Sequence, residues 1–197
     1  MSATNRGTKR KESDFYATPL ESVYSLLDNY NNISPNDRIL EPSAGNGNII
    51  KALRNRGYKN FITAIELREE ERKNLHESGA DQVAILDFIK YGQCVNYEDY
   101  DVIIGNPPYS LAPEFIDKSL ELLKPGGRLI FLLRTNFLES DKRFEWWQDK
   151  LPNGLYTLHK RPSFTGKGTD ATSYSWFIWE KSRIVNDFLR YQEIRVI

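Results

Sequence analysis

The chain has 197 residues, enough for one domain with a substantial hydrophobic core. Its composition, 40% hydrophobic and 27% charged, is typical of a soluble globular protein. No apolar segment approaches the roughly 20 residues that span a bilayer, and the polar first 13 residues lack the apolar stretch of a signal peptide. One cysteine and two histidines disfavour a disulfide framework and a metal site, and they favour a reducing, intracellular compartment.

The 27 basic and 27 acidic residues cancel, but they are unevenly distributed. Residues 1–13 and residues 151–197 each carry a net charge of +3, whereas residues 14–150 carry −6. The neutral total argues against tight nonspecific coating of nucleic acid, although the basic ends can meet phosphates locally. We expect a flexible basic arm over residues 1–13 and a single domain over residues 14–197.

Hydrophobic spacing predicts a helix followed by alternating strands and helices. Thr18-Pro19-Leu20-Glu21 has the form of a capping box with Pro19 at the first helical position, and an amphipathic helix is predicted over 19–30. Short apolar runs predict strands at 38–41, 61–66, 82–86, 101–104 and 128–133. Helical patterns occur at about 48–56, 68–78, 111–124 and 140–150.

Two further apolar runs, 154–159 and 174–179, flank a glycine-containing loop at 160–172 and predict an antiparallel hairpin at the sheet edge. Strands that alternate with helices indicate parallel strands joined by right-handed crossovers, with helices on both faces. The predicted fold is therefore α/β and Rossmann-like, with a mostly parallel sheet of seven strands that ends in the C-terminal hairpin.

A glycine-containing loop follows the first predicted strand and leads into a helix. Its residues are Glu41, Pro42, Ser43, Ala44, Gly45, Asn46 and Gly47. Glycines at this place let a ligand approach the backbone closely, and ligands of such sheets bind at the ends of the strands. The dinucleotide fingerprint would have a third glycine where Ile50 stands, so a pyrophosphate cofactor is disfavoured. A tight strand-to-helix turn without a ligand is the alternative.

The second and third predicted strands end in residues suited to a nucleoside. Glu66 can accept both hydroxyls of a ribose. The pair Asp87-Phe88 offers an acceptor for an exocyclic amine and an apolar face for a purine ring. Each of these residues alone could be an ordinary strand end, but together with the glycine-containing loop they indicate a pocket for an adenosine without phosphates.

The fourth predicted strand ends in Asn106-Pro107-Pro108-Tyr109. The two prolines stiffen this loop and remove two backbone donors, so the Asn106 side-chain oxygen and the Pro107 carbonyl remain as acceptors. The exocyclic amine of adenine is a poor nucleophile because its lone pair is delocalised into the ring. Two acceptors would localise that lone pair while Tyr109 stacks on the base. A rigid surface turn is the alternative.

The order of these motifs resembles the S-adenosylmethionine-dependent DNA methyltransferases of the N6-adenine type, in a small form similar to those of bacteriophages. The resemblance covers about residues 14–180 and implies a class I methyltransferase fold that binds S-adenosylmethionine. By resemblance, the glycine-containing loop, Glu66 and Asp87-Phe88 hold the cofactor, and residues 106–109 are catalytic. A family segment that contacts the methionine part of the cofactor is matched around Tyr16, Thr18 and Pro19.

The resemblance implies direct methyl transfer to the N6 amine of adenine in DNA, with the target base flipped out of the duplex. Tyr109 would stack on one face of the base, and Phe164 would cover the other unless it packs on the domain. No separate target-recognition domain is expected. Further nucleic-acid contacts are therefore expected from the basic arm, the 160–172 loop and the loop near 135–150, with Arg134, Lys142, Arg143, Trp146 and Trp147. Packing of the two tryptophans against the core is the alternative.

DNA is the expected partner, with no membrane, in the cytoplasm of a bacterium or a phage-infected cell; the oligomeric state stays open. An RNA base amino-methyltransferase would use the same pocket and is the first alternative. A protein glutamine methyltransferase usually has an N-terminal helical domain, for which the first thirty or so residues leave no room. A catalytically inactive binding scaffold is the third alternative, and it is disfavoured because every motif is intact.

Overall fold

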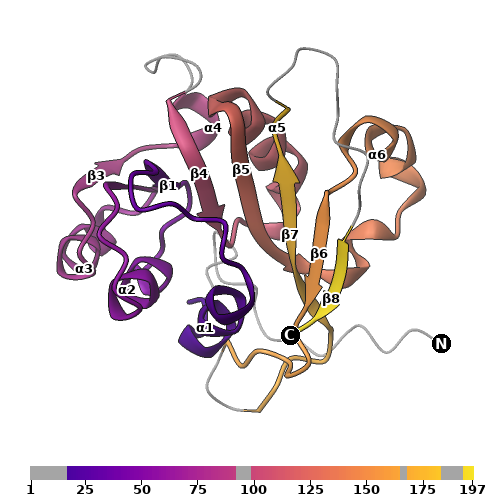
Figure 1. Cartoon of the computed structure of the whole chain (residues 1–197), viewed down its shortest axis with the longest axis horizontal. Helices are drawn as coiled ribbons and strands as arrows, with labels where there is room; N and C mark the ends of the chain where they lie inside the picture. Colours follow the sequence, from indigo (N-terminus) through magenta and orange to yellow (C-terminus); the bar gives the residue numbers. More distant parts are fainter. Residues whose placement is uncertain (1–16, 92–98, 165–167, 183–192) are drawn as a thin grey trace.

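The computed structural model describes residues 17–91, 99–164, 168–182 and 193–197, which form one mixed sheet with helices on both faces (Figure 1). The predicted basic arm and Tyr16 lie outside the described residues. The described strands are β1 Ile39–Glu41, β2 Ile62–Glu66, β3 Gln82–Ile85, β4 Tyr100–Gly105, β5 Leu123–Arg134, β6 Gly154–Thr157, β7 Tyr174–Glu180 and β8 Glu193–Val196. The α-helices are α1 Leu20–Asn29, α2 Asn48–Asn55, α3 Arg72–Glu77, α4 Phe88–Tyr91, α5 Ala112–Leu122 and α6 Phe144–Lys150.

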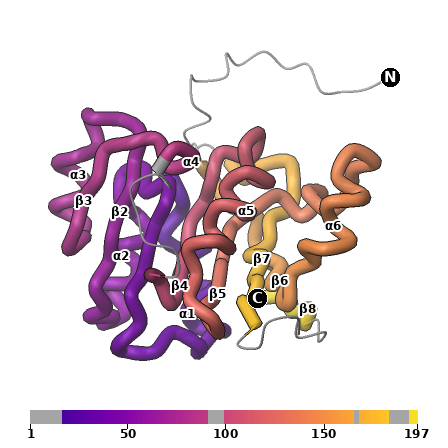
Figure 2. The backbone as a smooth tube through the Cα atoms, turned by 90° about the horizontal axis from the view of Figure 1, so that it is seen from above, coloured from indigo at the N-terminus to yellow at the C-terminus, as the bar shows by residue number. Residues whose placement is uncertain are grey.

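The sheet has a parallel half and a half that contains antiparallel pairs. Its strand order is β3-β2-β1-β4-β5-β7-β6-β8, and Figure 2 shows it running across the molecule from β3 to β8. Strands β3, β2, β1, β4 and β5 pair in parallel, and β7 is antiparallel to both β5 and β6. The predicted mostly parallel sheet with a C-terminal hairpin is therefore confirmed.

The eighth strand, β8, was not predicted. It pairs in parallel with β6 and forms an edge of the sheet. Its apolar residues Ile194 and Val196 are 76% and 73% exposed. A four-residue strand that buries neither of these side chains carries almost no hydrophobic signal, which is why the prediction of seven strands was one short.

Alternation along the strands divides the core into two layers. In β4, Val102 and Ile104 pack in the layer that contains α1, α2 and Leu75 of α3, whereas Ile103 packs in the layer of α5 and α6. Successive side chains of a strand point to opposite faces, so a strand that is apolar throughout must be covered on both sides. The two helical layers cover the two faces. Because β1 to β5 are parallel, their carboxyl ends lie at one edge of the sheet. No helix in the described part of the chain is long and apolar enough to cross a membrane.

The start of α1 differs from the predicted capping box. Helix α1 begins at Leu20 after Pro19, whose backbone is extended, and no side chain caps it. Thr18 is 7% exposed, and its hydroxyl instead accepts a hydrogen bond from Asn106, 88 residues further along the chain. A long-range partner thus replaces the local one that the motif predicts, because Pro19, and not Thr18, immediately precedes the helix.

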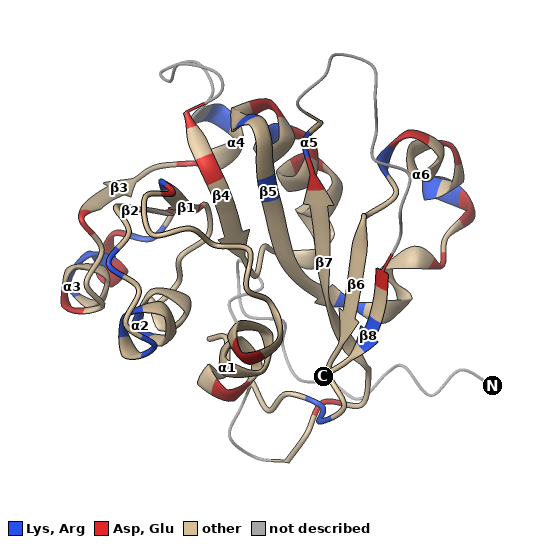
Figure 3. Cartoon of the chain, viewed as in Figure 1, with Lys and Arg blue, Asp and Glu red and all other residues tan. Residues whose placement is uncertain are grey.

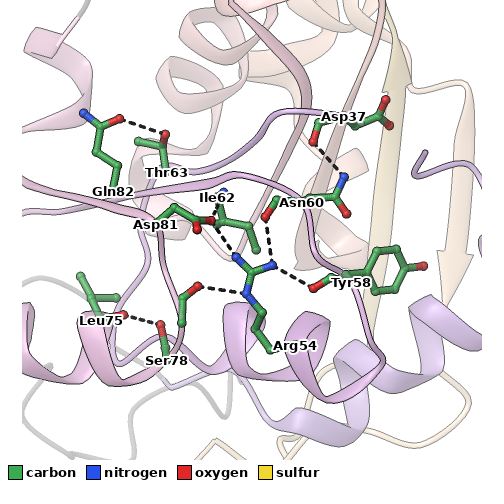
Figure 4. A network of polar contacts seen from close by, with 11 residues as sticks. Asp37, Arg54, Tyr58, Asn60, Ile62, Thr63, Leu75, Ser78, Asp81 and Gln82 are labelled. Carbon is green, nitrogen blue, oxygen red and sulfur yellow. Dashed lines mark hydrogen bonds and ion pairs between the residues drawn. The ribbon is translucent and has the colours of Figure 1, made fainter. Parts of the chain in front are cut away.

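Arg54 links the end of α2 to the loops that precede β2 and β3 (Figure 4). Its guanidinium donates to the carbonyls of Tyr58 (2.9 Å), Asn60 (3.0 Å) and Gly79 (3.0 Å), and it pairs with Asp81 (2.8 Å). One planar fork of donors thereby serves three backbone acceptors in these loops. The contacts hold the loops before β2 and β3 against the end of α2.

We predict that Arg54→Met lowers the free energy of unfolding by about 2 to 3 kcal/mol, because several carbonyls lose a charged donor. Arg56→Met is the matched control, since Arg56 pairs with the exposed Asp28 and lies over Tyr24, and it should cost less than about 1 kcal/mol. Urea unfolding of both variants measures the difference. Equal losses would contradict the role assigned to Arg54.

Candidate functional site

A cleft opens where the carboxyl ends of the neighbouring strands β2, β1 and β4 meet. Eight of the residues predicted to hold a cofactor line it: Thr18, Glu41, Ser43, Ala44, Gly45, Glu66, Asp87 and Phe88. Asn106 and Pro108 of the predicted catalytic loop line the same cleft. Among the described residues predicted to bind the cofactor or to be catalytic, Pro19, Gly47, Pro107 and Tyr109 do not belong to its lining, and none of the four further residues predicted to bind substrate does: Arg134, Lys142, Arg143 and Phe164. The structure thus brings the two groups of predicted residues to one place.

The glycine-containing loop between β1 and α2 is held tightly. Gly45 and Gly47 have φ values of 55° and 77°, which favour glycine. A Cβ at Gly47 would lie 2.5 Å from the Cβ of Ser78, so this glycine is also required by packing against the end of α3. The Gly45 backbone donates to the Glu66 carboxylate over 2.7 Å. The loop therefore presents a fixed backbone to the cleft.

Glu66 lies in the cleft with both carboxylate oxygens in use. Oε2 accepts from the Gly45 backbone, and Oε1 accepts from the backbone and the Nε of Arg68, at 3.1 and 2.9 Å. Arg68 also pairs with Glu71 at 3.2 Å. A carboxylate has about four acceptor positions, so Glu66 retains some capacity for hydroxyl donors. If a ribose hydroxyl donates to Oε1, it competes with Arg68 for this oxygen. The sequence spacing does not indicate this competition.

Glu41, at the end of β1, is a buried carboxyl group beside Glu66. It is 2% exposed, and its Oε2 finds no hydrogen-bond partner among the described residues. Burial, together with the negative charge of Glu66, raises the pKa of Glu41 well above its ordinary value. The hydroxyl of Ser43, two residues on, also lacks a described partner. The cleft therefore contains two buried polar groups that a polar ligand can satisfy.

Asp87 and Phe88 form the wall of the cleft at the start of α4. The Asp87 carboxylate accepts from the backbone of Ile89 over 3.0 Å. Phe88 is 3% exposed, and its ring centroid lies 5.0 Å from that of Phe115. Together they place an acceptor beside an apolar surface, as the sequence predicts for a purine subsite.

The loop after β4 positions Asn106 between two partners. The amide Nδ2 donates to the Thr18 hydroxyl over 3.1 Å, and Oδ1 accepts from the Tyr109 hydroxyl over 3.0 Å. Burial, chiefly, and the neighbouring Tyr174 raise the pKa of Tyr109 well above its ordinary value, so its hydroxyl stays protonated and can donate. The acceptor oxygen predicted for a substrate amine is thus already occupied by a donor from the protein.

The ring of Tyr109 lies among residues whose role the sequence did not reveal. The Arg134 guanidinium lies over it, 5.2 Å from the ring centroid, and the Tyr174 ring is 5.9 Å away. The Tyr174 hydroxyl donates to Asp170 over 3.0 Å. A tyrosine within a strand is typical of a core position, so no local pattern marks Tyr174 as a neighbour of the catalytic loop.

The residues predicted to bind substrate differ in how free they are. Arg143 donates to the carbonyls of Phe137 and Glu139, so it holds its own loop together. Burial lowers the pKa of its guanidinium. Lys142 and Arg134 are exposed. Phe164 is half-buried, with its edge on Tyr174 at 5.1 Å. Figure 3 shows basic and acidic residues interspersed over α3 and α6.

This architecture is the fold of the class I S-adenosylmethionine-dependent methyltransferases. A crystal structure from Listeria monocytogenes that was assigned to this class has a TM-score of 0.66 at 18% identity, and the match covers 91% of this chain and 65% of that one. At such low identity the similarity shows the fold alone. No protein-family model matches the chain.

Two curated proteins are similar in sequence over part of the chain. Type II methyltransferase M.CvrRI of Paramecium bursaria Chlorella virus XZ-6E is 29% identical over 111 residues, which are 55% of this chain and 28% of that protein. A protein of Methanosarcina mazei named probable ribosomal RNA small subunit methyltransferase A is 33% identical over 92 residues, 45% of this chain and 32% of that protein. The chain therefore matches about a third or less of each relative's length.

We predict that the burial of Glu41 makes the stability of the protein depend on pH. The folded state keeps a proton that the unfolded state releases above the ordinary glutamate pKa, so the free energy of unfolding should fall as pH rises from about 5 to 8. In Glu41→Gln this contribution should disappear, whereas the exposed control Glu70→Gln should behave like the wild type. Urea unfolding across this pH range is the measurement, and parallel profiles for wild type and Glu41→Gln would contradict the prediction.

Proposed function

We propose that this protein is an S-adenosylmethionine-dependent methyltransferase that modifies the exocyclic N6 amine of adenine in DNA. The observation that carries the proposal is the shared cleft: the glycine-containing loop and its acidic neighbours line the same cavity as Asn106. A nucleoside cofactor and an amine acceptor must lie within reach of each other for direct transfer, and this cleft allows that.

The residues of the cleft suit this cofactor. Oε2 of the buried Glu41 carboxyl and the Ser43 hydroxyl both lack described partners, so they can bind the polar, cationic amino acid end of such a ligand. Glu66 would accept from the ribose, and Asp87 with Phe88 would hold the adenine. When bound, S-adenosylmethionine supplies a methyl group activated by a positively charged sulfur.

Asn106 would act on the acceptor amine. Its Oδ1 and the Pro107 carbonyl would accept from the two amine hydrogens, localising the nitrogen lone pair toward the methyl group. In the structure, Oδ1 accepts from the Tyr109 hydroxyl, so a substrate amine would replace one donor with another and leave the amide satisfied. For Tyr109 to stack on the base, its ring would have to leave its contacts with Arg134 and Tyr174.

The nature of the substrate is supported by the relatives. Similarity to a viral type II methyltransferase favours DNA, and similarity to a protein named as a ribosomal RNA methyltransferase keeps RNA as the second candidate. Duplex DNA hides the amine within a base pair, so the proposal includes flipping of the target base. The exposed Lys142 would contact phosphates, and so would the exposed Arg134, whose guanidinium lies over the ring of Tyr109 in the catalytic loop.

The proposal is tested with purified protein, labelled S-adenosylmethionine and matched DNA and RNA substrates, followed by mass spectrometry of the digested nucleosides. We expect N6-methyladenine from DNA. Asn106→Ala should lower kcat by about a hundredfold or more, while the dissociation constant of the cofactor changes little. The exposed control Asn55→Ala should keep the wild-type rate. Label in RNA alone would overturn the DNA assignment, and a wild-type rate for Asn106→Ala would overturn the catalytic one.

Phe164→Ala tests whether this ring covers the target base. If it does, the loss of one stacking partner should lower kcat/KM for nucleic acid by about tenfold or more. Phe61→Ala is the control, because Phe61 is 47% exposed and lies just before β2, at the opposite end of that strand from the cleft. Unchanged kinetics together with a lower unfolding temperature would assign Phe164 to packing against Tyr174 alone.

A further inference from the structure

The amide of Asn106 has two chemically opposite ends, and only one of them can serve the proposed reaction. An oxygen that faces the substrate amine accepts its N–H groups, whereas an NH2 group in that place would repel them. The terminal torsion of an asparagine side chain has two broad minima, so its neighbours must select the orientation. The neighbours that select the orientation of the Asn106 amide therefore affect the rate of the proposed reaction.

The two protein partners of Asn106 are both hydroxyl groups. Thr18 Oγ1 lies 3.1 Å from Nδ2, and the Tyr109 hydroxyl lies 3.0 Å from Oδ1. The partner on the Oδ1 side competes with a substrate amine, because that oxygen is the proposed acceptor. The partner on the Nδ2 side can remain throughout. Thr18 is thus the partner that can hold the amide while the substrate is bound.

Thr18 itself is held in place by other contacts. It is 7% exposed, and its carbonyl accepts from the Asn48 side chain over 2.8 Å. Asn48 is the first residue of α2 and follows Gly47 of the glycine-containing loop. The residue that contacts the amide of Asn106 is therefore fastened to the loop proposed to bind the cofactor, which links the two halves of the cleft.

We propose that Thr18 is a positioning residue whose hydroxyl fixes the amide of Asn106 with its oxygen toward the acceptor amine. This inference rests on the proposed methyltransferase function. It gives the Thr18 hydroxyl a role beyond the cofactor contact expected from sequence resemblance. Because Pro19 precedes α1 directly, the Thr18 side chain is not needed as a helix cap and is used across the cleft.

Three variants separate positioning from packing. Thr18→Val keeps the shape and removes the acceptor, Thr18→Ser keeps the hydroxyl, and Thr63→Val makes the same change at a buried position in β2 away from the cleft. We expect Thr18→Val to lower kcat by about tenfold, as loss of one hydrogen bond implies, with cofactor affinity within about twofold of wild type. Thr18→Ser should recover most of the rate, and Thr63→Val should keep it.

A second readout does not depend on activity. In 15N-labelled protein, the Asn106 side-chain NH2 signals, assigned by their loss in Asn106→Asp, should be protected from exchange in the wild type, Thr18→Ser and Thr63→Val. They should lose protection in Thr18→Val. If the wild type methylates neither DNA nor RNA, the proposed function fails, but this measurement still decides whether Thr18 holds the amide.

Three results would overturn the inference. The first is unchanged NH2 protection in Thr18→Val. The second is an equal loss of kcat in Thr18→Ser and Thr18→Val, which would indicate packing. The third is a wild-type kcat in Thr18→Val with cofactor affinity about tenfold weaker, which would make the hydroxyl a cofactor contact only.

Discussion

The arrangement of the site depends on one amide at the carboxyl end of β4. Asn106 is held between the hydroxyls of Thr18 and Tyr109, which come from two segments distant in sequence from each other. The segment before α1 can reach it because β4 lies next to β1, and the loop after β1 leads into α2, whose Asn48 holds Thr18. The parallel sheet thus brings together the segment before α1, the loop after β1 and the loop after β4, and their side chains meet around Thr18 and Asn106.

The same edge of the sheet brings two acidic side chains to one cleft. Glu41 and Glu66 end neighbouring strands, and only Glu66 has donors for both oxygens, from Gly45 and Arg68. Burial disfavours the ionised form of a carboxyl group, and together with the charge of Glu66 it raises the pKa of Glu41, whose Oε2 lacks a described partner. Such a group reduces stability unless a ligand satisfies it, and strongly shifted groups in clefts are typical of functional sites. The proposed cationic cofactor would supply a positively charged hydrogen-bond donor for Oε2 of Glu41.

Much of the fold was predictable because it rests on local signals. Continuous apolar strands such as β4 alternate with amphipathic helices, and this pattern specifies a parallel sheet covered on both faces. The glycine-containing loop and the Asn106–Tyr109 loop were predictable as strand-end motifs for the same reason. Strand β8 was missed because its exposed Ile194 and Val196 lack a buried stripe.

The details of the site were less predictable because they depend on contacts between distant segments. A capping box at Thr18 is a sound local interpretation, yet the hydroxyl bonds to Asn106. Arg143 has the composition of a phosphate contact, but its donors are used by the carbonyls of Phe137 and Glu139. Glu66 lines the cleft, while no local pattern indicates that Arg68 pairs with it. In each case the residue type indicates what a group can bind, and only the tertiary structure shows what it binds.

The central claim is that a cofactor and an amine acceptor meet in the cleft between the glycine-containing loop and Asn106. A crystal structure with S-adenosylhomocysteine and adenosine tests this most directly. The account predicts the cofactor product along Glu41, Glu66 and Phe88, with the adenosine amine against Asn106 Oδ1 in place of the Tyr109 hydroxyl. Electron density for the cofactor product away from this cleft, or with Asn106 turned from the adenosine amine, would contradict it.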